Sequence, residues 1–284
     1  MNLLSAVRRV RAHARATAAA LAAPVGAVAM AALTAAPALA HDTWFERVEA
    51  GERAAAQPLQ LALGTGTHYP RYEDPVQPKY LAHLACVDGQ GTAYKTEPAR
   101  AGRRHTVVRV PGLDAAAFSC VARLHSFEIE LTPALVDVYF EEIRAGDALR
   151  AVLSRQRAQG QPFEERYLKV ARIEGLVAPA RPQSAERQPL DVLRVAPGGV
   201  LKAGAEAVFE VQRDGKPLAD QPVQLLNDAA PAGLWARTDA AGRITIRLPL
   251  PGRWLLRGVD LRPPASEGAR WESRFIAYTF EVAR

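Results

Sequence analysis

The sequence lacks the motifs that mark the common enzyme classes. It contains no H-E-x-x-H helix, no G-x-S-x-G elbow, no Walker loop and no G-x-G-x-x-G turn. Its adjacent carboxylates, Glu141-Glu142 and Glu164-Glu165, are typical of solvated faces and not of catalytic pairs. We therefore expect a protein that is not an enzyme.

Acidic residues are absent from the first 40 positions. This segment has four arginines between positions 8 and 15, then an alanine-rich apolar stretch, and it ends in Ala38-Leu39-Ala40. A basic start, an apolar middle and an A-x-A ending are typical of a secretory signal peptide. A transmembrane anchor is the alternative, but alanine is only weakly apolar. Residues 1–40 are therefore predicted to be a signal peptide, cleaved after Ala40 from a periplasmic protein.

Little net charge remains after that segment. The first 40 residues hold four of the 36 Lys and Arg and none of the 30 Asp and Glu, so the rest carries 32 basic against 30 acidic residues, a net charge of +2. No basic stripe favours nucleic acid as a partner. No later run reaches the roughly 18 apolar residues of a membrane span. We expect neither nucleic-acid binding nor a membrane span after cleavage.

Cysteine is scarce, with Cys86 and Cys120 the two present. Both lie in segments that resemble strands. An even count in an exported chain favours a disulfide bond. The alternative is a pair of metal thiolates, which an oxidising compartment disfavours.

The apolar pattern is mainly that of β-strands. Short apolar runs that end in Gly, Pro or Asp turns recur from residue 43 to about 125 and again after residue 190. Between these regions, Thr132-Pro133 is typical of a helix start, with apolar residues at helical spacing as far as Ile143. A second helix is predicted from Pro162 to Gly175, after a polar loop.

These patterns predict a mainly β fold in two domains. An N-terminal antiparallel β domain with a short helical insertion is expected at residues 41–176. A polar, proline-rich linker follows at 177–189. Several short strands between turn signals then predict an immunoglobulin-like or prealbumin-like β-sandwich at 190–284.

Histidine is absent from the predicted second domain. After cleavage, His41 would be the first residue, and its free α-amine and ring Nδ1 can chelate one nickel, cobalt or copper ion. His68 lies in a loop, close to Glu73, which would supply an oxygen ligand or accept a hydrogen bond from a metal-binding histidine. His125, after a strand, is the candidate third ligand. The predicted metal residues are therefore His41, His68, Glu73 and His125.

The order of several short motifs resembles a known family. His41-Asp42-Thr43-Trp44 begins the series, Gly66-Thr67-His68-Tyr69-Pro70 follows, and Leu131-Thr132-Pro133 and Gly252-Arg253-Trp254 come later. The chain is similar to the bacterial domain-of-unknown-function family described as the periplasmic component of a nickel/cobalt uptake system. The resemblance implies a two-part, β-rich periplasmic protein that handles transition metals, with an inner-membrane metal permease as its partner.

Three functions remain open from the sequence. The first is a periplasmic transition-metal-binding accessory protein that uses His41. The second is a non-catalytic envelope protein with a β-sandwich module for a ligand or carbohydrate, in which Trp235, Trp254 and Trp271 would stack on sugars. The third is a copper enzyme built on the N-terminal histidine, for which no further catalytic residues are evident.

Overall fold

A computed structural model describes residues 41–48, 59–113, 117–175, 177–178, 188–266 and 268–284. The predicted signal peptide, residues 1–40, lies outside the described residues. Pro37–Arg284 forms one compact unit, to which all the described residues belong.

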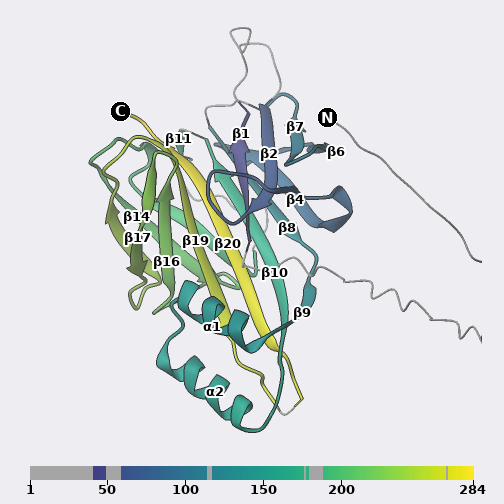
Figure 1. Ribbon diagram of the computed structural model, residues 1–284. Coiled ribbons are helices and arrows are strands. Elements are labelled where there is room, and N and C mark those ends of the chain that lie inside the picture. The colour runs from purple at the N-terminus through teal and green to yellow at the C-terminus, as the bar shows by residue number, and fades with distance from the viewer. Residues whose placement is uncertain (1–40, 49–58, 114–116, 176, 179–187, 267) are drawn as a thin grey trace, which may run out of the picture. The chain divides into compact units, whose positions relative to one another are not determined.

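The largest element is a nine-stranded sheet with the order β17-β16-β19-β20-β10-β8-β4-β5, in which β9 also pairs with β10 (Figure 1). The strands of this central sheet are β4 Leu81–Asp88, β5 Ala93–Tyr94, β8 Phe118–Leu124, β9 Phe127–Leu131, β10 Phe163–Glu174, β16 Pro222–Asn227, β17 Ala230–Arg237, β19 Gly252–Arg262 and β20 Trp271–Val282. All its pairings are antiparallel except that of β10 with β20. Strands from both sides of the predicted linker are thus hydrogen-bonded in one sheet.

Two smaller sheets accompany the central one. The first has the order β1-β2-β7-β6, with β3 paired to β2, and comprises β1 Asp42–Arg47, β2 Leu59–Gly66, β3 Asp74–Pro75, β6 Glu97–Ala101 and β7 Thr106–Val110. The second has the order β12-β14-β15, with β18 paired to β14, and comprises β12 Leu190–Ala196, β14 Glu206–Arg213, β15 Lys216–Pro217 and β18 Arg243–Arg247. Further short elements are the 3-10 turn η2 Pro78–Tyr80 and the pair β11 Val177–Ala178 and β13 Gly199–Val200.

The alternation of side chains along β20 determines what covers each face of the central sheet. Ile276 and Tyr278 belong to the core shared with Phe209 and Val192 of the second small sheet. Phe275, one residue away, belongs to the core under the helices. Because successive side chains of a strand point to opposite faces, the second small sheet covers one face, and the helices cover part of the other.

The first small sheet packs on the same face as the helices. Its Leu61 and Val108 share a core with Cys120 and Ile173 of the central sheet, while Val121 and Val170, one position away along β8 and β10, belong to the opposite core. The predicted mainly β fold, with antiparallel sheets, sandwich packing and short helices, is confirmed. Strand β1 lies against β10 and β20. This contact positions His41, the residue that precedes β1 in the sequence.

The predicted disulfide is also confirmed. Cys86 on β4 and Cys120 on β8 are bonded, and the two residues lie directly opposite each other in the strand register. They are 34 residues apart in sequence, so the chain-entropy relation gives a stabilisation of about 4 kcal/mol. The described residues contain no free cysteine, which rules out the alternative of two metal thiolates.

One helix prediction is confirmed and the other is wrong. Helix α1 spans Pro133–Glu142 with Thr132 as its N-cap residue, as predicted. The second helix, α2, spans Asp147–Ala158, and the segment predicted to be helical is strand β10. Both faces of β10 are covered, and charged residues such as Glu165 and Arg172 are buried in it, so its period-2 pattern is hidden. Helix α2 buries Leu153 and packs the half-buried Leu149 and Val152 against the same core, so its apolar stripe is short.

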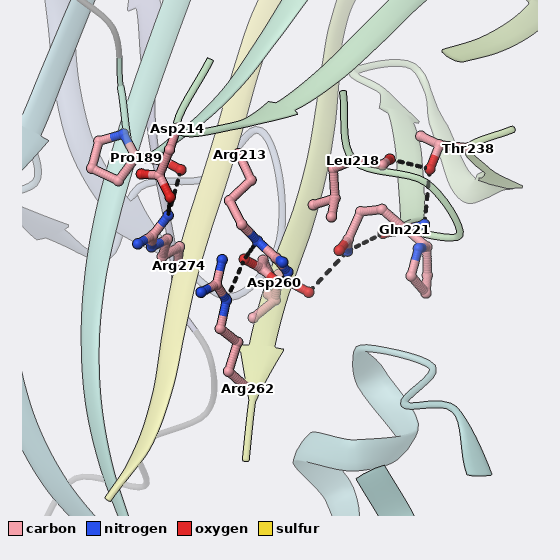
Figure 2. Close-up of polar contacts among 11 residues, drawn as sticks. Pro189, Arg213, Asp214, Leu218, Gln221, Thr238, Asp260, Arg262 and Arg274 are labelled. Carbon is pink, nitrogen blue, oxygen red and sulfur yellow. Dashed lines mark hydrogen bonds and ion pairs between the residues drawn. The ribbon is translucent and has the colours of Figure 1, made fainter. Parts of the chain in front are cut away.

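A polar cluster links the second small sheet to the central one (Figure 2). The Arg213 guanidinium on β14 donates to the Asp260 carboxylate on β19, and Arg262 lies 3.5 Å from the same carboxylate. Beside them, Arg274 on β20 donates to the Asp214 carboxylate at 2.9 Å and to the carbonyl of Pro189 at 2.8 Å. These contacts join the two sheets near the ends of β14 and β19.

Candidate functional site

The pairing of β1 with β2 brings His41 to the loop between β2 and β3. Asp42 lies opposite Gly66 in the register, so His41 is beside the residues that follow Gly66. The His41 Nε2 atom is 2.9 Å from the Glu73 Oε2 atom. Two of the four residues that the sequence predicts as a metal site are therefore in direct contact.

Glu73 is held as a carboxylate by the same loop. Its Oε1 accepts a hydrogen bond from the Thr67 backbone N–H at 3.2 Å, and its Oε2 accepts one from the Thr67 hydroxyl at 3.2 Å. The backbone hydrogen bond from Thr67 is the largest effect that lowers the pKa of Glu73, and the contact with His41 adds to it. An ionised carboxylate can only accept hydrogen bonds, so His41 Nε2 carries the proton in this contact. In the neutral ring, Nδ1 is then the nitrogen with the lone pair.

The loop has little freedom to move away from β1. A Cβ atom on Gly66 would lie 2.3 Å from the Arg71 carbonyl oxygen, so this position requires glycine. The Tyr72 ring stacks on Trp44 with the ring centroids 4.9 Å apart. The Tyr72 hydroxyl also donates to the carbonyl of Ala62 at 3.0 Å. Loop, β1 and β2 therefore form one packed unit around the His41–Glu73 pair.

Two further contacts anchor the start of β1 to the central sheet. The Lys169 ammonium on β10 donates to the His41 carbonyl oxygen. The Asp42 carboxylate accepts from the Arg257 guanidinium on β19 at 2.6 Å. With the Glu73 contact, residues 41 and 42 are fixed through a ring, a carbonyl and a carboxylate.

Lys169 is the most perturbed cation of the site. Burial lowers the pKa of its ammonium to about 8, and the negative charges of Asp42 and Glu165 partly oppose that effect. Its Nζ also lies 5.6 Å from the ring centroids of both Tyr167 and Phe275. Burial of the Lys169 charge is unfavourable, and the hydrogen bond from Lys169 fixes the backbone of His41.

A small cavity opens beside this anchored segment. Its volume is about 30 Å³, and its lining includes Asp42, Glu142 and Arg257 on the polar side and Trp235 and Phe275 on the apolar side. Such a volume is close to that of one water molecule or a single ion. Sequence reasoning assigned Glu142 to a solvated helix face and overlooked Lys169 and Arg257, because only the packing of β1 on the sheet brings them to His41.

The other two predicted ligands are not in contact with this pair. His68 is exposed in the same loop, where its carbonyl accepts from the Arg71 backbone N–H at 2.8 Å. His125 is exposed just after β8, and its backbone N–H donates to the Tyr80 carbonyl at 2.9 Å. In the described part of the chain, no three side chains of His, Cys, Asp or Glu converge closely enough to hold a metal ion.

The described residues also bear on the membrane prediction. None of their helices is both long and apolar enough to cross a bilayer.

Comparison with protein families gives a match that covers most of the chain. Residues 38–259 match a family described as a domain of unknown function, DUF4198. No curated protein matches the chain. The match begins next to the expected cleavage site and covers β1, the loop with Glu73, both helices and most of the central sheet. The chain therefore belongs to the DUF4198 family, as its motif order indicated.

Proposed function

We propose that the protein is a periplasmic transition-metal-binding accessory protein, in which His41, as the mature N-terminus, chelates nickel, cobalt or copper. The observation that carries the proposal is the 2.9 Å contact between His41 Nε2 and Glu73 Oε2. Metal-binding histidines commonly donate their second ring N–H to a carboxylate, which fixes the tautomer and orients the ring. Glu73 has this orienting role in the proposal, and Nδ1 is the metal-binding nitrogen.

The anchoring of residues 41 and 42 supports the same proposal. A chelate needs the α-amine and Nδ1 of one residue to be turned toward the same ion. The Lys169 contact with the His41 carbonyl and the Arg257 contact with Asp42 restrict rotation of the chain at that residue. Since His41 alone would supply two nitrogen ligands, the site does not require three converging side chains.

Other residues near the mature N-terminus would support metal binding by His41. His68, exposed in the same loop, would be a further nitrogen ligand, whereas the backbone N–H of His125 bonds to the Tyr80 carbonyl outside that loop. An inner-membrane metal permease would be the partner that receives the ion. Trp254 and Trp271 are buried in the cores, 2% and 1% exposed, so sugar stacking on them has no support.

The test compares two forms of the protein that differ by one residue. The first begins at His41, and the second has one glycine ahead of it. Near-stoichiometric uptake of Ni²⁺ or Cu²⁺ is expected for the first form, with affinity at least about tenfold lower for the second, because the extension converts the amine into an amide. Isothermal titration calorimetry measures both affinities.

Intact-mass and elemental analysis of the exported protein supply the control. They report the true first residue, the disulfide and any bound metal in one sample. Equal affinities for the two forms would overturn the chelate.

A further inference from the structure

We propose that the protein has a second binding site, in a cavity at the base of the helical hairpin formed by α1 and α2. Its ligand is an uncharged, mainly apolar small molecule that carries a hydrogen-bond acceptor such as a carbonyl group. The residues that line this cavity do not include those assigned to the His41 site. The inference goes beyond the proposed metal binding and does not depend on it.

The helical hairpin joins the central sheet at the ends of β9 and β10 (Figure 1). The last residue of β9, Leu131, lies opposite the first residue of β10, Phe163, in the strand register. The cavity is bounded by these two strand ends, by the first turn of α1 and by the C-terminal half of α2. Its walls therefore belong to four different elements.

The size of the cavity suits a small molecule. Its volume is about 740 Å³, and small-molecule pockets in proteins have volumes of roughly 300 to 1,000 Å³. Half of the residues that line it are apolar, namely Leu131, Pro133, Val136, Leu153, Pro162 and Phe163. Four of these six, Leu131, Val136, Leu153 and Phe163, belong to the core under the helices. The apolar floor of the cavity is therefore fixed by packing before any ligand binds.

Gln156 supplies a free hydrogen-bond donor to the wall. Its side chain accepts a hydrogen bond from Trp271 Nε1 at 2.7 Å. Because an indole N–H can only donate, the atom that it meets is the amide oxygen of Gln156. The amide nitrogen forms none of the hydrogen bonds found among the described residues. A carbonyl oxygen of the ligand would accept one of its two hydrogens.

The charged residues of the wall disfavour an ionic ligand. The Arg157 guanidinium lies 2.8 Å from the Asp137 carboxylate and donates to the Pro133 carbonyl at 3.0 Å. Glu130 is exposed and also lines the cavity. Glu130 repels an anion and Arg157 repels a cation, while the apolar floor has no partner for a charge of either sign. Since a charge in apolar surroundings loses its hydration, the ligand that fits is uncharged.

The first experiment tests the hydrogen-bond donor. The probe is prodan, an uncharged naphthalene with one ketone, whose fluorescence shifts to shorter wavelength in apolar surroundings. It is titrated into the protein that begins at His41 in the presence of EDTA. The variant Gln156→Glu keeps an acceptor for Trp271 and removes the amide donors. The matched control Gln159→Glu adds the same charge at the end of the same helix, outside the residues that line the cavity.

The second experiment tests the cavity itself. The variant Gln161→Trp places an indole at a half-buried residue that lines the cavity, so the new ring occupies space that the probe needs. Its matched control is Gln159→Trp, at an exposed residue that does not line the cavity. Circular dichroism verifies that all four variants fold.

We expect one prodan molecule to bind per chain. Its affinity should fall at least about fivefold in Gln156→Glu and at least about tenfold in Gln161→Trp. In the two Gln159 variants it should change less than about twofold, as is usual for surface substitutions. The anionic probe anilinonaphthalene sulfonate should bind more weakly than prodan.

Three results would overturn the proposal. They are the absence of prodan binding, an equal loss in a variant and its control, and tighter binding of the anionic probe than of prodan. Because EDTA removes any metal ion, none of these results bears on chelation by His41.

Discussion

At the scale of single residues, the site depends on groups that hold the backbone of His41. Lys169 is the clearest case, because it donates to the carbonyl of His41 and keeps a pKa of about 8. An unfolded lysine has a pKa of about 10.4. Between these two pH values, unfolding takes up a proton, so the free energy of unfolding rises with pH across this window.

We expect the substitution Lys169→Met to remove that pH dependence. The free energy of unfolding of the unsubstituted protein, relative to that of the variant, should increase by about 1 to 2 kcal/mol from pH 8 to pH 10, where the upper value corresponds to the full pKa shift and the lower one allows for the partly exposed side chain. Urea denaturation at several pH values measures it. A constant difference over this range would contradict the assignment. The variant should also bind Ni²⁺ more weakly, since the carbonyl of His41 loses its anchor.

At the scale of secondary-structure elements, β10 connects the layers of the protein. Lys169 on one face reaches β1, and Arg172 on the opposite face reaches β12. Arg172 is 1% exposed and forms two hydrogen bonds of 2.8 Å with the Asp191 carboxylate. Its remaining nitrogen donates to the Ser119 hydroxyl at 2.8 Å. The charge is therefore fully paired, and β10 is fixed between its two neighbouring layers.

The substitution Asp191→Ala should destabilise the protein by about 3 to 5 kcal/mol, because it leaves the Arg172 charge buried without a partner. The matched control is Glu128→Ala, which removes the partner of Arg166 in an exposed pair on β9 and β10. That change should cost less than about 1 kcal/mol. Chemical denaturation of both variants measures the difference, and equal costs would contradict the buried role of Arg172.

At the scale of the whole molecule, one sheet crosses the predicted domain boundary. Strands β10 and β20 pair in parallel from Glu165 opposite Trp271 to Ile173 opposite Thr279. One strand precedes the proline-rich segment and the other ends the chain. The division into two domains at residues 177–189 stays a prediction, and this pairing defines how to test it.

If the shared sheet governs stability, residues 41–284 should unfold in a single calorimetric transition, with calorimetric and van't Hoff enthalpies equal. A fragment of residues 190–284 should then fail to fold, because β20 would lose β10 and expose an unpaired edge. Two transitions, or a folded fragment, would favour independent domains. Scanning calorimetry and circular dichroism of the two forms distinguish these outcomes.

Much of the fold could be predicted because strands and turns have recognisable local sequence patterns. The strands around Leu61, Val108 and Phe209 and the helix that follows Thr132 were evident from periodicity and turn residues. Strand β10 was not, because both its faces are buried and its charged residues are paired inside the protein. Period-2 alternation is visible only where one face of a strand meets water.

The candidate site was likewise predictable from the sequence only in part. The sequence by itself determined that His41 follows an A-x-A ending, that Glu73 lies in a nearby loop, and that the chain after Ala40 has no thioether. Only the tertiary structure decided that Glu73 contacts the His41 ring and that Lys169 donates to the His41 carbonyl. It also decided that Glu142 and Asp42 line one cavity. Those contacts depend on the register of β1 with β2 and on the packing of β1 against β10 and β20. Strand register and sheet packing are set by contacts between distant segments, which local sequence patterns do not encode.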